Sequence, residues 1–115
     1  MEHAARGARA AGGLTIGLLP GDDPDEANEY VDVAIVTGLG LARNAILART
    51  ADGVVALGGG LGTLSEIALA LRNRRPTIGI QTWRFDRDRR TEPELPTAAN
   101  PHDALEWLFA RMDRS

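Results

Sequence analysis

The chain has no cysteine and no lysine, and only 4% of its 115 residues are aromatic. The lack of cysteine excludes disulfide bonds and thiolate metal sites. No apolar run is long enough to cross a membrane, and no charged, apolar and small-residue leader opens the sequence. We therefore expect a soluble, cytoplasmic protein with no membrane partner.

The charge balance gives no reason to expect a nucleic acid partner. The 13 basic residues, all of them arginine, are outnumbered by 16 acidic residues, which leaves a formal net charge of -3. Nucleic-acid-binding domains typically carry a basic surface. We expect a small molecule as the ligand.

Strands and helices are predicted to alternate along the chain. Apolar runs of strand length predict strands over residues 14–19, 31–36, 53–57 and 76–81. Periodicity and capping signals predict helices over 2–11, 41–50 and 62–74, and a last helix that Asn100 and Pro101 open. The stripe Ala104, Leu105, Leu108, Phe109 and Met112 of that helix is expected to face the core, and residues 83–99 are expected to be irregular. This order predicts one α/β domain, 1–115, with a doubly wound parallel sheet.

The most informative segment is LGGGLGTLSE, which runs from Leu57 to Glu66. It joins a predicted strand to a predicted helix through a glycine turn. Such a turn brings backbone N–H groups and the positive end of a helix dipole to one spot, which favours phosphate or another anion. Gly59, Gly60 and Gly62 are the expected ligand-binding residues, because glycine lets a ligand approach the backbone closely.

Thr63 and Glu66 allow two interpretations. Thr-x-x-Glu at a helix start is a capping box, in which the Thr63 side chain accepts the Glu66 N–H and Glu66 reaches back to the Thr63 N–H. Alternatively, Glu66 acts on the ligand. Binding of phosphate does not need a carboxylate, so a carboxylate beside an anion site indicates a role toward the rest of the ligand. The spacing by itself favours the cap. Ser65 lacks the sequence pattern of an activated nucleophile and is expected on the helix surface.

Three segments in order resemble the LOG (Lonely Guy), or SLOG, superfamily, whose members were once labelled lysine decarboxylases. They are GGLTIGLLPG at 12–21, Arg43-Asn44 followed by Ala51-Asp52, and GGLGTLSE at 59–66, which is similar to the family pattern PGGxGTxxE. Gly58 stands where that pattern has Pro, and Asn44 stands where the cytokinin-activating enzymes have Lys. Both departures resemble the smaller branch that includes molybdenum-cofactor carrier proteins. The resemblance implies a Rossmann-like fold and a homodimer or higher homo-oligomer.

Members of that superfamily have an N-terminal βαβ portion, with its own glycine-rich phosphate loop, before the part that this chain matches. Met1-Glu2 is similar to an internal position of their second crossover helix. We therefore expect an N-terminally truncated version of the fold, from either a misassigned start or a real truncation.

The resemblance also assigns roles to individual residues. It makes Thr63 a phosphate contact and Glu66 the catalytic carboxylate that faces the ribose. Arg43, which from the sequence alone is a solvated helix residue, becomes a pocket cation and the catalytic partner of Glu66. A second set of ligand-binding candidates follows a predicted strand, at the edge where such sheets bind ligands: Thr37, Gly38 and Gly40.

Four functions are compatible with these residues. The first is binding of a nucleotide or a nucleotide-like phosphate ligand. The others are phosphoribohydrolase activity on nucleoside 5'-monophosphates, carriage of the molybdenum cofactor, and a non-catalytic interaction role. No cofactor is expected to be required, although the molybdenum cofactor is a possible carried ligand. No metal site is expected, because the acidic loop at 22–26 lacks the spacing of an EF-hand.

Overall fold

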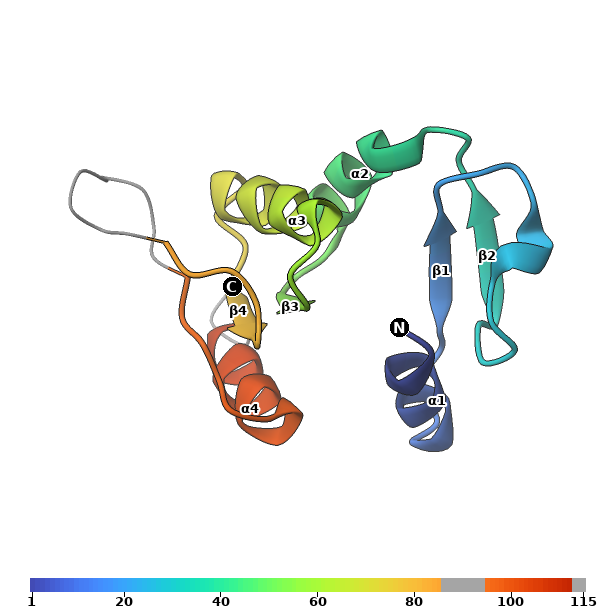
Figure 1. Cartoon of the computed structure of the whole chain (residues 1–115). Helices are drawn as coiled ribbons and strands as arrows, with labels where there is room; N and C mark the ends of the chain where they lie inside the picture. The colour runs from blue at the N-terminus through green and yellow to red at the C-terminus, as the bar shows by residue number, and fades with distance from the viewer. Residues whose placement is uncertain (86–94, 113–115) are drawn as a thin grey trace. The chain divides into compact units, whose positions relative to one another are not determined.

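The structure is a computed structural model that describes residues 1–85 and 95–112. It has an α/β fold whose strands pair in parallel, as the sequence predicts (Figure 1). The chain divides into two compact units, Met1–Arg43 and Asn44–Ser115. The strands form two two-stranded sheets, with β1 paired to β2 in the first unit and β3 paired to β4 in the second. None of the helices in the described part combines the length and apolar character needed to cross a membrane.

The first unit consists of one helix, two parallel strands and two short 3-10 helices. These elements are α1 (Glu2–Ala10), β1 (Ile16–Leu19), η1 (Pro24–Glu26), β2 (Val33–Val36) and η2 (Gly40–Ala42). The register pairs Ile16 with Val33 and Leu18 with Ile35. Since side chains alternate between the two faces of a strand, these four residues share one face of the sheet. Three of them are exposed: Ile16 by 58%, Val33 by 43% and Ile35 by 44%.

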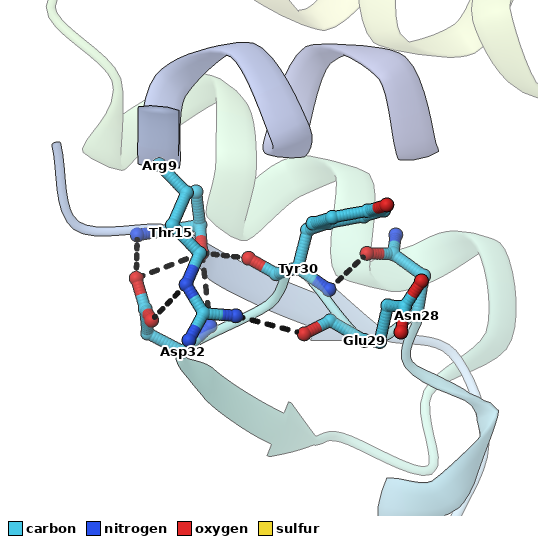
Figure 2. Close-up of polar contacts among 6 residues, drawn as sticks. All are labelled: Arg9, Thr15, Asn28, Glu29, Tyr30 and Asp32. Atoms are coloured by element: carbon cyan, nitrogen blue, oxygen red, sulfur yellow. Dashed lines mark hydrogen bonds and ion pairs between the residues drawn. The ribbon is translucent and has the colours of Figure 1, made fainter. Parts of the chain in front are cut away.

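A polar cluster fastens α1 and the start of β1 to the segment that precedes β2 (Figure 2). The Thr15 hydroxyl accepts the Asp32 N–H and donates to the Tyr30 carbonyl. Arg9 donates to the Glu29 carbonyl at 2.9 Å and lies 3.6 Å from the Asp32 carboxylate. Hydrogen bonds from the backbone and the side chain of Thr15 hold the pKa of Asp32 below its usual 3.8, and the Arg9 charge acts in the same direction. Burial opposes this shift.

The second unit holds the glycine turn. Its elements are α2 (Arg43–Thr50), β3 (Val54–Leu57), α3 (Leu61–Arg72), β4 (Thr77–Ile80) and α4 (Pro101–Met112), where the first residue of α2, Arg43, is the last residue of the first unit. The register pairs Val54 with Thr77 and Leu57 with Ile80. Residues 86–94, within the predicted irregular segment, lie outside the described part. The rest of that segment returns to β4, where Gly79 pairs with Thr97.

Helices α3 and α4 cover opposite faces of the β3–β4 sheet (Figure 1). On one face Ala56 packs with Ile67 of α3, and on the other Ile78 and Ile80 pack with Ala104 of α4. β4 is buried along its whole length, because both faces of this strand are covered.

The start of α4 is as predicted, but part of its apolar stripe is not. The Asp103 N–H donates to the Asn100 side chain at 2.8 Å, which makes Asn100 the N-terminal cap ahead of Pro101. Ala104 and Leu108 are buried, whereas Leu105 is 43% and Phe109 51% exposed. The prediction that the last two face the core was wrong, because the buried side of α4 is narrower than the apolar stripe in the sequence.

Candidate functional site

The glycine turn joins β3 to α3 and leaves the N-terminus of the helix open. Gly58 has a φ of +87°, a conformation that favours glycine. Gly60 is the N-cap of α3 and supplies no side-chain cap. A Cβ added at Gly59 or Gly60 would meet no atom within 4 Å among the described residues. The first backbone N–H groups of a helix have no partner within it, so this turn presents donors to an open space.

The capping-box interpretation of Thr63 was wrong. Thr63 is the third residue of α3, not its N-cap, and its hydroxyl donates to the Leu57 carbonyl at 3.3 Å. The helix begins at Leu61, one residue before the predicted start, because Gly60 already adopts the extended conformation of a cap. The Thr63 side chain therefore ties the helix back to the end of β3.

Asn44 of α2 contacts the first turn of α3. Its side-chain NH2 donates to the Gly62 carbonyl at 3.3 Å and to the Ser65 hydroxyl at 2.9 Å. Asn44 is 1% exposed, and its side-chain oxygen is buried without a hydrogen-bond partner in the part of the chain that the structure describes. Ser65 is half-buried, so the expectation that it lies on the helix surface was wrong. Glu66 follows Ser65 on α3 and is also half-buried.

Two residues after β4 also hold the glycine turn. The Thr82 hydroxyl donates to the Gly58 carbonyl, and the Trp83 indole N–H donates to the Gly60 carbonyl at 3.1 Å. Neither residue was predicted to touch the turn. Both are 23 or 24 positions away in sequence, and no local pattern marks such a contact.

The second set of candidates lies in the first unit, on the loop that follows β2. The Thr37 hydroxyl donates to the Leu19 carbonyl at 2.7 Å. The N–H groups of Gly38 and Gly40 donate to Gly21 and Pro20, which belong to the loop after β1. The two loops are thereby joined at the carboxyl ends of two parallel strands, the edge at which α/β sheets commonly bind ligands.

Arg43 anchors to the sheet of the first unit. Its guanidinium donates to the Leu18 carbonyl of β1. Its Nε is buried and has no hydrogen-bond partner among the described residues. Arg43 is therefore held by a backbone carbonyl, unlike the freely solvated arginine that its sequence context suggests.

The structure thus divides the candidate residues between the two units. Gly59, Gly60, Gly62, Thr63 and Glu66 come together in the second unit. Thr37, Gly38, Gly40 and Arg43 belong to the first unit. The pairing of Arg43 with Glu66 stays a prediction. Among residues 1–85 and 95–112, no group of three or more His, Asp or Glu side chains is arranged to hold a metal ion.

Residues 1–105 match the model of the SLOG cluster4 family. The chain is also similar to an uncharacterised protein of Archaeoglobus fulgidus, with 44% identity over 81 residues. That match covers 70% of this chain and 53% of the archaeal protein, so the chain matches about half the length of that relative.

Two solved structures are similar over nearly all of the chain. The molybdenum cofactor binding protein from the phototrophic bacterium Rippkaea orientalis is 40% identical with a TM-score of 0.81, over 97% of this chain and 71% of that one. The molybdenum cofactor carrier protein MCP from Chlamydomonas reinhardtii is 33% identical with a TM-score of 0.77, over 100% of this chain and 71% of that one. These similarities confirm the predicted Rossmann-like α/β class.

Proposed function

Since the chain belongs to the SLOG cluster4 family, we propose that it binds a phosphate-bearing, nucleotide-like small molecule at the glycine turn between β3 and α3. The observation that carries the proposal is the open turn: within residues 1–85 and 95–112, no atom lies within 4 Å of a Cβ position at Gly59 or Gly60, and α3 has no side-chain cap. Oriented N–H groups and the helix dipole attract an anion there.

Among phosphate-bearing ligands, the molybdenum cofactor is the cargo that the similar proteins favour. The Rippkaea protein is a binding protein for this cofactor, and the Chlamydomonas protein is a carrier of it. The pterin of the cofactor carries a phosphate, which the glycine turn would hold. In this role the chain carries the ligand without changing it, and no residue needs to perform chemistry.

The test is the substitution Gly60→Val. The φ of -73° and ψ of 161° at Gly60 suit a β-branched residue, so the variant is expected to fold. Its side chain would occupy the space at the helix N-terminus and abolish binding of AMP and inorganic phosphate in calorimetry. The control is Leu61→Ala, because Leu61 is 73% exposed and its N–H is kept. Equal affinities of Gly60→Val and the wild type would refute the proposal.

A second measurement identifies the cargo. The protein purified from its own cells is examined for bound pterin by fluorescence after release and oxidation. Pterin in the wild type but not in Gly60→Val would support the carrier role. A wild type that binds AMP but contains no pterin, and takes up none, would leave a nucleotide as the ligand.

A further inference from the structure

Three side chains hold carbonyl groups in the glycine turn and at the start of α3. Their donors are the Thr82 hydroxyl, the Trp83 indole N–H and the Asn44 side-chain NH2. The carbonyls that accept these hydrogen bonds alternate along the chain: those of Gly58 and Gly60 in the turn, and that of Gly62 in the first turn of α3. Thr82 and Trp83 follow β4, whereas Asn44 comes from α2, so two separate parts of the second unit hold the turn.

Each of these contacts also helps to fix the direction of an N–H group. At Gly60 the indole shares this role with the helix, because the same carbonyl accepts the Leu64 N–H at 3.1 Å. In a planar trans peptide unit, the C=O of one residue and the N–H of the next point in opposite directions, and no cis peptide is present in the described part. A donor that holds a carbonyl therefore turns the following N–H away from itself. The N–H groups oriented in this way belong to Gly59, Leu61 and Thr63.

The buried position of Asn44 is unfavourable for its side-chain oxygen, and the hydrogen bonds of its side-chain NH2 must compensate for this. Its side-chain oxygen is buried without a partner among the described residues, and leaving a buried acceptor unpaired is unfavourable. The side-chain NH2 of Asn44 donates to two of the first five residues of α3, at the Gly62 carbonyl and the Ser65 hydroxyl. The side-chain hydrogen bonds that the structure shows for Asn44 are therefore those that hold the start of α3.

We propose that Asn44, Thr82 and Trp83 are positioning residues for the anion site, which fix the glycine turn with its N–H groups already directed at the ligand. This inference rests on the proposed function, because only a bound anion uses those N–H groups. A terminal phosphate is the ligand chemistry that fits best, since it offers three free oxygens as acceptors. Orienting the donors before binding avoids the entropy of ordering a glycine-rich loop when the ligand arrives.

Near-isosteric substitutions separate hydrogen bonding from packing. Trp83→Phe removes the indole N–H but keeps an aromatic ring against the cluster that contains Ala56, Ile67 and Leu95. Thr82→Val removes the hydroxyl, whereas the matched control Thr82→Ser keeps it. We expect Trp83→Phe and Thr82→Val each to weaken AMP binding by roughly three- to tenfold, the range for one lost hydrogen bond. Thr82→Ser should bind nearly as the wild type does.

Binding is measured by calorimetry below the melting temperature of each variant. NMR spectra then follow the amide signals of Gly59, Leu61 and Thr63 while inorganic phosphate is added. In the wild type these signals should shift together, and in Trp83→Phe the Leu61 shift should shrink most. A purely structural contact would lower the melting temperature without selecting that amide.

The outcomes distinguish this inference from the proposed function. If the wild type binds AMP and both Thr82→Val and Trp83→Phe bind it equally well, the positioning role is wrong and the anion site stands. If the wild type binds neither AMP nor inorganic phosphate, the proposed function fails and the positioning role fails with it.

Discussion

Thr15 and Asp32 exchange hydrogen bonds in both directions. The Thr15 N–H donates to the Asp32 carboxylate at 2.9 Å, and the Asp32 N–H donates to the Thr15 hydroxyl at 2.9 Å. One residue precedes β1 and the other precedes β2, so the pair sets the parallel register at the start of both strands (Figure 2). The Asp32 N–H and the Val33 N–H both also donate to the Thr15 carbonyl.

Stability of the first unit should fall in acid because of this pair. The pKa of Asp32 is lowered by the hydrogen bonds from Thr15. A carboxyl group whose pKa is lower in the folded state stabilises fully above its unfolded pKa, and this contribution is lost as the pH falls through the folded value. The stability difference between wild type and Asp32→Asn should therefore narrow below pH 3.8, the usual pKa. This difference in unfolding free energy is measured by urea unfolding, followed by the NMR signals of Tyr30. A difference that does not change with pH would contradict the expectation.

The Thr15 hydroxyl should be needed for the stability of the first unit. Thr15 is 8% exposed, and its hydroxyl both donates to Tyr30 and accepts from Asp32. Thr15→Val leaves the Tyr30 carbonyl and the Asp32 N–H without that partner, which should cost about 1–3 kcal/mol. Thr15→Ser keeps the hydroxyl and serves as the control. Equal unfolding free energies for the two variants would show that the hydroxyl is not the stabilising group.

The substitution Glu66→Gln should have different effects in a carrier protein and in a phosphoribohydrolase. In a carrier, Glu66→Gln should bind AMP at least as tightly as the wild type, because the change removes a negative charge from the early turns of the helix at the anion site. In a phosphoribohydrolase, the same change should lower the release of base from AMP by on the order of a hundredfold, because glutamine neither transfers a proton nor stabilises developing positive charge. Base release is followed by chromatography for wild type, Glu66→Gln and Arg43→Ala. A wild type that releases base at the rate of Glu66→Gln would exclude a catalytic carboxylate.

The chain should form a homodimer or a larger assembly. The face of the first sheet that carries Ile16, Val33 and Ile35 leaves these side chains between 43% and 58% exposed, and adjoining apolar side chains of this size favour association. Light scattering at micromolar concentration should therefore give at least twice the mass of the chain. The double substitution Ile16→Thr and Ile35→Thr should shift the protein toward the monomer, with Leu105→Thr as a control on a different exposed residue. A wild type that is monomeric throughout would disprove this prediction.

Local patterns in the sequence were sufficient to predict the order and type of the main helices and strands. Periods of about two and about 3.6 residues are local, so apolar runs and capping signals placed the strands and the last helix within a few residues of their observed bounds. The glycine turn at 58–60 and the Asn100 cap were predictable for the same reason, because each depends on neighbours in the chain. The resemblance of three short segments to one family was likewise sufficient to predict the α/β class and the family.

The contacts of the polar side chains near the turn could not be predicted, because they depend on long-range packing. Thr63 could not be excluded as a cap until Gly60 was seen in that position. The contacts of Asn44, Thr82 and Trp83 join residues 18 to 24 positions apart. Such contacts depend on how helices and strands pack, which periodicity does not encode. The same holds for α4, where Ala104 packs against β4 and Phe109 is left exposed.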